Sequence, residues 1–224
     1  MPELVKIPLA SAEFVARFDR PYVGLLVSDR PKIFEAIMMA LLPFDFRLAN
    51  TEIVSTGKPV EEKLIFRIPD RGISFQFGAE EYRFGKDGAS WATAPEDAEI
   101  WRAAETALLT ESGAKVRSCS VTSAMHLQLL SKTREEVLAP FISPPFKQLL
   151  AEKQAESFGC HIRFANGDVL IDHSLAYANG IFLKFLTRFQ GKPSIDDILA
   201  GVRGDEEQVF RMLDVHEATE ATND

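Results

Sequence analysis

The longest regular pattern in the chain is an alternation of side chains from Lys115 to Leu130. A period of two residues is typical of a β-strand, whose successive side chains point to opposite faces of a sheet. The pattern therefore predicts one long central strand. One face is expected to pack on a core: Arg117, Cys119, Val121, Ser123, Met125, Leu127 and Leu129. The other is small and polar: Ser118, Ser120, Thr122, Ala124, His126 and Gln128. We interpret this second face as a floor on which a partner or ligand lies.

The N-terminal part of the chain predicts two strands followed by a helix. Alternation over residues 12–18 and an extended apolar run over 22–27 indicate the strands. Apolar residues then recur at a spacing of three and four from Ile33 to Leu42, which is the pattern of one helical face. Ser28 or Asp29 is expected to cap this helix, because a short polar side chain accepts a hydrogen bond from the first turn.

A meander and a second helix are predicted next. Between Phe46 and Phe84 the period of two returns, and Gly- and Pro-containing turns separate its last three runs, which predicts an antiparallel meander. Thr93 and Glu96 have the spacing of a capping box, in which each side chain bonds the other residue's backbone amide. The helix that begins there is expected to end near Gly113, in the left-handed conformation.

After the long strand, short helices precede a second set of strands. Thr133 and Glu136 form another capping box, and Phe146, Leu149 and Leu150 mark a further short helix. Two Asn-Gly pairs lie between alternating runs, and this dipeptide strongly favours hairpin turns. Three strands are predicted, over 157–165, 168–175 and 181–189.

The C-terminal part predicts two helices and a tail. Ser194 is placed to cap a helix over Ile195–Val202, and beyond Gly204 a second helix is expected to reach Val215. Residues 218–224 are expected to form a frayed acidic tail. The chain thus predicts an α+β fold with an antiparallel sheet and helices packed mainly on one face.

The predicted elements occur twice in the same order: strand, helix, meander, helix. The halves are residues 1–113 and 114–217, expected to pack as one globular unit. In this order of elements the chain resembles the TATA-binding-protein and helix-grip classes. That resemblance implies a curved sheet with helices on one face and an open face on the other. A likeness of element order implies no function.

Composition narrows the function classes. The chain has 224 residues, 46% of them hydrophobic, which suffices for a sizeable core. Its net charge of -8 disfavours nucleic acid as a partner, because phosphates would be repelled. Cys119 and Cys160 lie among apolar residues and are expected to be reduced. With no apolar run typical of a signal peptide or a membrane span, we expect a cytoplasmic protein.

Four histidines are the obvious candidates for chemistry: His126, His161, His173 and His216. Cys119 and His126 are seven residues apart in one strand, and Cys160 and His161 are adjacent. An odd separation directs the two side chains of each pair to opposite faces of a strand, so no metal site is predicted. Asp172, His173 and Ser174 have the residue types of a catalytic triad, but neighbours along a strand diverge. A site joining His126 and His161 would require their two strands to pair.

The last predicted strand has one apolar and one mixed face. Phe182 and Leu186 share a side with Lys184 and Arg188, which is consistent with contact to a partner. Together with Lys192, these cations are consistent with a local patch for an anion or an acidic partner.

We therefore predict a non-enzymatic protein, without a cofactor, that holds a partner protein or small ligand on the open face of its sheet. The candidate binding residues are Ser120, Thr122, His126, Gln128, His161 and Arg163. A hydrolase that uses His126 or His161 with a distant carboxylate is the alternative. A nucleic-acid binder of the curved-sheet kind is a third reading, which the charge disfavours. A homo-oligomer is compatible with all three.

Overall fold

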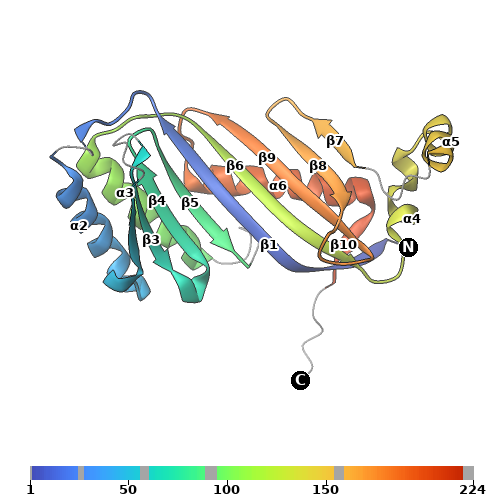
Figure 1. Cartoon of the computed structure of the whole chain (residues 1–224), viewed down its shortest axis with the longest axis horizontal. Helices are drawn as coiled ribbons and strands as arrows, with labels where there is room; N and C mark the ends of the chain where they lie inside the picture. Colours follow the sequence, from blue (N-terminus) through green and yellow to red (C-terminus); the bar gives the residue numbers. More distant parts are fainter. Residues whose placement is uncertain (1, 25–27, 56–60, 89–94, 154–158, 219–224) are drawn as a thin grey trace, which may run out of the picture.

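The computed structural model describes residues 2–24, 28–55, 61–88, 95–153 and 159–218. These residues form an α+β fold built on one antiparallel sheet (Figure 1), as predicted. The strands are β1 (Glu3–Phe18), β2 (Thr51–Val54), β3 (Lys63–Ile68), β4 (Ile73–Gly78), β5 (Glu81–Asp87), β6 (Val116–Leu129), β7 (Cys160–Arg163), β8 (Gly167–His173), β9 (Gly180–Gln190) and β10 (Val215–Glu217). The α-helices are α2 (Arg30–Leu41), α3 (Pro95–Ser112), α4 (Arg134–Leu138), α5 (Pro144–Glu152) and α6 (Ile195–Leu213). Short 3-10 helices lie at Leu42–Phe44, Leu48–Asn50, Pro69–Arg71 and Ala139–Phe141.

Two long strands, β1 and β6, form the centre of the sheet. The strand order is β2-β3-β4-β5-β1-β6-β9-β8-β7. In each half of the chain the last meander strand returns to the first long strand, so that β5 pairs with β1 and β9 pairs with β6. The specific strand order of the TATA-binding-protein class is not confirmed.

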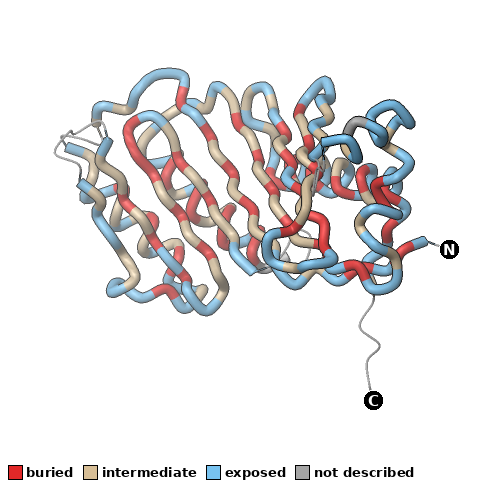
Figure 2. The backbone as a smooth tube through the Cα atoms, turned by 45° about the vertical axis from the view of Figure 1, so that its right-hand side comes forward, coloured by how far each residue is buried: buried red, intermediate tan, exposed pale blue. Residues whose placement is uncertain are grey.

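The helices α3 and α6 cover one side of the sheet (Figure 1). Buried and less buried residues alternate along the strands because only this side packs on a core (Figure 2). On β6, Val121, Met125 and Leu127 are at most 2% exposed, while Ser120 and Thr122 on the other side are partly exposed. The predicted division of this strand into two faces is confirmed from Cys119 onward; Arg117, expected on the core side, is exposed.

We call the side away from α3 and α6 the open face. It is the side to which Ser120 and Thr122 of β6 point. Strand pairing extends it to β1, where Glu13 and Val15 lie opposite these two residues. The same pairing extends it through β9 and β8 to the edge strand β7.

Helix α6 joins the two halves of the core. Its first turns place Ile198 and Val202 in the apolar cluster around β1–β5, whereas Val209 and Leu213 pack in the cluster around β6, β8 and β9. Carboxylates also tie the helices to the sheet: Glu206 accepts a hydrogen bond from Ser123. One helix thus stabilises both halves.

Three expectations about elements are corrected. The chain forms no strand at residues 22–24, and 25–27 lie outside the described residues. α6 runs without interruption through Gly204, because the burial of Val209 and Leu213 outweighs the roughly 1 kcal/mol by which glycine disfavours a helix. The residues before the predicted tail form β10, which pairs in parallel with β1.

Helix caps follow the predictions in part. At α4 the Thr133 and Glu136 capping box is present. At α2 the cap residue is Asp29, but its carboxylate accepts hydrogen bonds from Tyr22 and Ser28 instead of from the helix. Gly113 has the predicted left-handed conformation, with φ of 62°. The capping box at Thr93 lies partly outside the described residues.

Candidate functional site

The six predicted binding residues lie on one side of the sheet. Four lie on β6 and two on the edge strand β7, and all are partly or fully exposed: Ser120, Thr122, His126, Gln128, His161 and Arg163. The two groups do not meet. Strands β9 and β8 lie between β6 and β7, so three spacings of about 4.8 Å separate them. His126 and His161 therefore form no common site, because their strands do not pair.

His126 is held by two neighbours. Its Nδ1 lies 2.8 Å from Oγ of Ser174, and its ring centroid is 4.9 Å from that of Phe182 on β9. The Ser174 oxygen also accepts hydrogen bonds from the backbone amides of Ala176 and Tyr177. Its hydrogen is therefore available to His126, and in the neutral imidazole tautomer that suits this contact Nδ1 accepts.

This geometry does not resemble an activated serine. The lone pairs of the Ser174 oxygen are engaged by two amides, and the residue is only 7% exposed. Among the described residues, no carboxylate is hydrogen-bonded to His126. A histidine that activates a nucleophile is normally oriented by a third group. The contact between His126 and Ser174 instead fixes the turn that follows β8.

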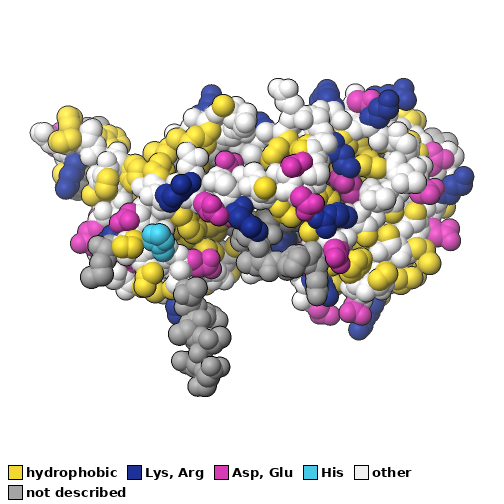
Figure 3. Space-filling view, turned by 180° about the vertical axis from the view of Figure 1, so that it is seen from behind, with side chains coloured by type: hydrophobic (Ala, Val, Ile, Leu, Met, Phe, Trp, Pro, Cys, Tyr) yellow, Lys and Arg dark blue, Asp and Glu magenta, His cyan; other side chains and the backbone are white. Residues whose placement is uncertain are grey.

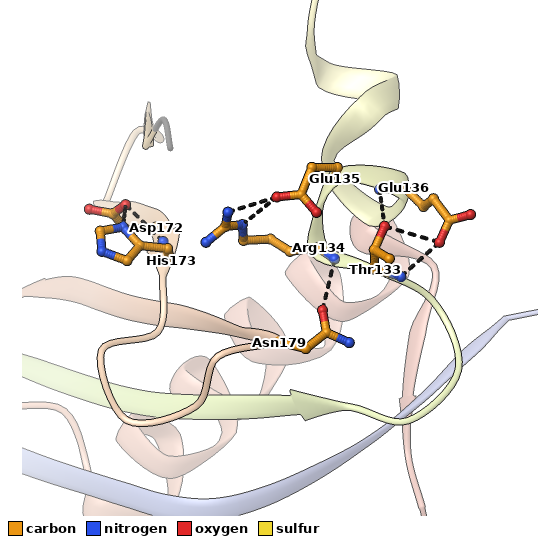
Figure 4. Close-up of polar contacts among 7 residues, drawn as sticks. All are labelled: Thr133, Arg134, Glu135, Glu136, Asp172, His173 and Asn179. Atoms are coloured by element: carbon orange, nitrogen blue, oxygen red, sulfur yellow. Dashed lines mark hydrogen bonds and ion pairs between the residues drawn. The ribbon is translucent and has the colours of Figure 1, made fainter. Parts of the chain in front are cut away.

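The Asp172-His173-Ser174 segment does not form a triad. Oδ1 of Asp172 lies 2.9 Å from Nδ1 of His173, and the two side chains lie together at the end of β8 (Figure 4). Ser174 contacts His126 instead of His173. The three side chains thus divide between two separate pairs.

The loop between β8 and β9 is anchored to the start of α4 through Asn179. The backbone amide of Arg134 donates to Oδ1 of Asn179 at 3.1 Å (Figure 4), and the Asn179 amide donates to the carbonyl of Lys132. The second Asn-Gly turn is therefore bonded to the start of α4, and the helix closes this end of the sheet.

His161 belongs to an ion-pair group at the edge of the sheet. Its Nε2 lies 3.3 Å from Oδ1 of Asp168, whose other oxygen is 3.0 Å from Arg188. Burial alone would raise the pKa of Asp168, but hydrogen bonds from His161 and Arg188 hold it below its usual range. Asp168 is therefore a carboxylate that neutralises the cation beside it.

The part of the open face over β2–β5 and the C-terminal part of β1, where Glu13 lies, carries ion pairs whose charges neutralise one another. Arg67 pairs with Glu52 at 2.5 Å. The Arg83 guanidinium lies between two carboxylates, with one nitrogen 2.5 Å from Oε1 of Glu81 and another 3.2 Å from Oε1 of Glu13. This part offers a charge-balanced surface.

The half over β6, β9, β8 and β7 has a different character. Lys184 is exposed in the middle of the sheet, opposite Ala124 on β6 and Leu170 on β8. Phe182 and Leu186 flank it on β9, as the mixed face of this strand predicts. Lys192, grouped with these cations from the sequence, pairs with the buried Glu105 on the other side of the sheet at 2.8 Å.

Two adjoining pockets lie away from these residues. They have volumes of about 370 and 450 Å³ and share Asp19, Arg20 and Pro21, which follow the end of β1. None of the six predicted binding residues lines either pocket. The sequence contains no periodic pattern that points to them, since they form where a loop meets the start of β6.

Both cysteines are free thiols, as predicted. Burial, together with the nearby Glu105 carboxylate, raises the pKa of Cys119 to about 11, so its thiol is not activated. Within the described ranges, no group of three or more His, Cys, Asp or Glu side chains is arranged to hold a metal ion.

On the side covered by helices, acidic and basic side chains are interspersed (Figure 3). None of the described helices combines the length and the apolar character that a membrane span requires. Comparison of the sequence with protein-family models finds no match, and comparison with curated proteins finds none either.

Proposed function

We propose that this protein is a non-enzymatic docking protein that holds a partner protein on the open face of its sheet. The observation that supports the proposal is the combination of a broad uncovered sheet face with exposed apolar side chains at its centre. Leu9 of β1 is 47% exposed, and Phe182, Leu170 and Leu186 are partly exposed on the same side. Apolar side chains that gather on one surface commonly mark interaction sites.

The geometry favours a partner protein over a small ligand. A small ligand generally binds in a concave pocket that buries most of its surface. The two pockets described above lie beyond the end of β1, away from His126 and Gln128. A broad sheet face suits a partner that covers many side chains at once.

A site-specific crosslinking experiment tests the proposal. A photo-crosslinking amino acid placed at Ser120, in the middle of the open face, is expected to trap a partner when the protein is expressed in its own organism. The matched control is the same amino acid at Glu99, which is exposed on α3 on the helix-covered side. Equal crosslinking from both positions would contradict the proposal.

A pair of neighbouring substitutions separates docking from folding. Gln128→Trp enlarges an exposed residue of the open face and is expected to abolish the Ser120 crosslink while changing stability by less than about 1 kcal/mol. Leu127→Ala removes a fully buried side chain and is expected to cost about 2–5 kcal/mol. If Gln128→Trp unfolds the protein as severely as Leu127→Ala, the open face is an interior surface and the proposal is wrong.

A further inference from the structure

The part of the open face over β6, β9, β8 and β7, together with the N-terminal part of β1 that carries Lys6, has an excess of positive charge, although the whole protein has a net charge of -8. Its two carboxylates are already engaged, Asp168 by Arg188 and Asp172 by His173. Three further cations lie exposed on this side with no ion pair among the contacts of the described residues: Lys6, Arg163 and Lys184. An acidic partner would neutralise them.

Apolar side chains lie between these cations. Leu170 lies beside Lys184 on the adjacent strand β8. Phe182 and Leu186 flank Lys184 along β9. Leu9 lies opposite His126, whose ring packs at a tilt against that of Phe182. We call the apolar residues Leu9, Leu170, Phe182 and Leu186, together with the cations Lys6, Arg163 and Lys184, the cationic patch. Lys184 lies among its apolar side chains, and Lys6 on β1 and Arg163 on β7 lie at its two edges.

The backbone of the sheet determines which secondary structure fits on this patch. β6 is paired on both sides, with β1 and β9, and β9 is paired with β6 and β8. Their amides and carbonyls are therefore unavailable to an added strand. A segment lying on the face must satisfy its own backbone hydrogen bonds, which a helix does internally.

The molecule contains an example of such packing on the opposite side of the same strands. α6 places Ile198, Val202 and Val209 on the sheet. It also directs Glu206 and Asp205 to Ser123 of β6 and Thr187 of β9, at 2.7 and 2.6 Å. Strands β6 and β9 thus already hold an acidic amphipathic helix on their buried side.

From these observations we infer that the partner segment on the cationic patch is an acidic amphipathic helix of a separate protein, an inference that rests on the proposed function. The mixed run from Phe182 to Arg188 extends for six residue steps, or about 20 Å. A helix of that length has about 14 residues. Its apolar side would contact Leu170, Phe182 and Leu186, and its acidic residues would pair with Lys184 and the cations at the edges.

A second copy of this chain is a less suitable occupant. The exposed acidic residues Asp196, Asp197 and Glu207 lie on α6, on the opposite side of the molecule. A contact between the back of one copy and the front of the next is head-to-tail, so it produces filaments unless the rotation between copies closes a ring. A separate partner avoids this outcome.

A synthetic helical peptide of about 15 residues tests the inference. The probe has leucines on one side and glutamates flanking them, and the control peptide has lysines in place of the glutamates. Fluorescence anisotropy is expected to show binding of the acidic peptide only. Lys184→Glu is expected to weaken binding by about tenfold or more, and raising the salt concentration from about 0.05 M to about 0.5 M should weaken it severalfold. Lys32→Glu, the same charge change at an exposed residue of α2, is expected to leave binding unchanged.

The outcomes distinguish this inference from the proposed function. If the Ser120 crosslink forms but Lys184→Glu affects neither it nor peptide binding, the face docks a partner of other chemistry and only the inference is overturned. If Ser120 traps no partner, the proposed function also fails. Self-association in sedimentation experiments that Lys184→Glu abolishes would identify a second copy as the occupant and would overturn the inference.

Discussion

The hydroxyl of Ser123 donates a hydrogen bond to Glu206 at 2.7 Å, and both residues are buried between β6 and α6. They are 83 positions apart in the chain. The contact is notable because Ser123 interrupts the apolar side of the long strand. The Ser123 hydroxyl donates a hydrogen bond to the buried Glu206 carboxylate, and such a bond offsets part of the cost of removing a charged group from water.

We predict that Ser123→Ala lowers the free energy of unfolding by about 1–3 kcal/mol, because the buried Glu206 carboxylate loses a hydrogen bond. Ser120 supplies the matched control, since it lies on the same strand but on the open face. Ser120→Ala is expected to change stability by less than about 0.5 kcal/mol. Urea unfolding curves measure both values, and equal effects would contradict the assignment of the two faces.

Glu3 is expected to stabilise the protein in a pH-dependent way. Its carboxylate is buried and accepts hydrogen bonds from the hydroxyl of Ser131 and from the backbone amides of Leu130, Ser131 and Lys132. Burial alone would raise the pKa of Glu3, but these hydrogen bonds outweigh it and leave the pKa below the ordinary value of 4.5. The folded state therefore favours the ionised form.

The sign of the pH dependence follows from that lowered pKa. The contribution of Glu3 is fully present above the unfolded pKa of about 4.5 and is lost as the pH falls through the lower folded pKa. Glu3→Gln should therefore cost about 1–3 kcal/mol at neutral pH, and the difference from the wild type should shrink in acid. Glu13→Gln, at a half-exposed ion pair, should cost less than about 1 kcal/mol. A Glu3→Gln difference that stays constant with pH would refute this role.

Gly204 lies in the interior of α6, and a Cβ atom added there would meet nothing within 4 Å. Gly204→Ala is therefore expected to raise stability by about 0.5–1 kcal/mol, because alanine favours the helix. At Gly72, φ is +63° and an added Cβ would lie 2.4 Å from the carbonyl oxygen of Asp87, so Gly72→Ala should destabilise. Thermal melting tests both, and a lower melting temperature for Gly204→Ala would indicate a break in the helix.

The two thiols should react at different rates. Cys119 is buried and the pKa of its thiol is raised to about 11, so its alkylation near pH 8 should be slow in the folded protein. Cys160 is half-buried on an edge strand and should react first. Mass spectrometry after timed alkylation measures the order. A mass that rises by two hydrogens on reduction would reveal a disulfide and contradict the expected free thiols.

Local periodicity was sufficient to predict which way many side chains face. The alternation through Val121 and Met125 separates the core side of β6 from the open face, and the three-and-four spacing after Ile33 identifies α2. Both predictions succeed because the direction of a side chain within a strand or helix depends on the positions of its near neighbours in the chain. A hairpin does join β7 and β8 beside Asn166-Gly167, but Gly167 lies in β8 and neither residue has a positive φ, so this dipeptide does not form the two-residue turn that it favours.

The contacts of the candidate site depend on which strands lie side by side in the sheet. Local periodicity along the chain does not predict this strand order. His126 meets Ser174, 48 positions away, because β9 and the turn after β8 lie beside β6. The separation of His126 from His161 has the same origin. Lys192 faces Glu105 instead of the open face because the chain turns back toward α6 after β9.

The sequence by itself therefore determined the α+β class, the two-faced central strand and the residue types exposed on its open side. Only the tertiary structure decided that α6 is continuous through Gly204, that β10 pairs with β1, and that Lys184 lies among apolar side chains without an ion pair in the described part of the chain. The physical reason is that these features depend on burial and pairing between distant segments, whose free energies exceed the local preferences that a sequence pattern records.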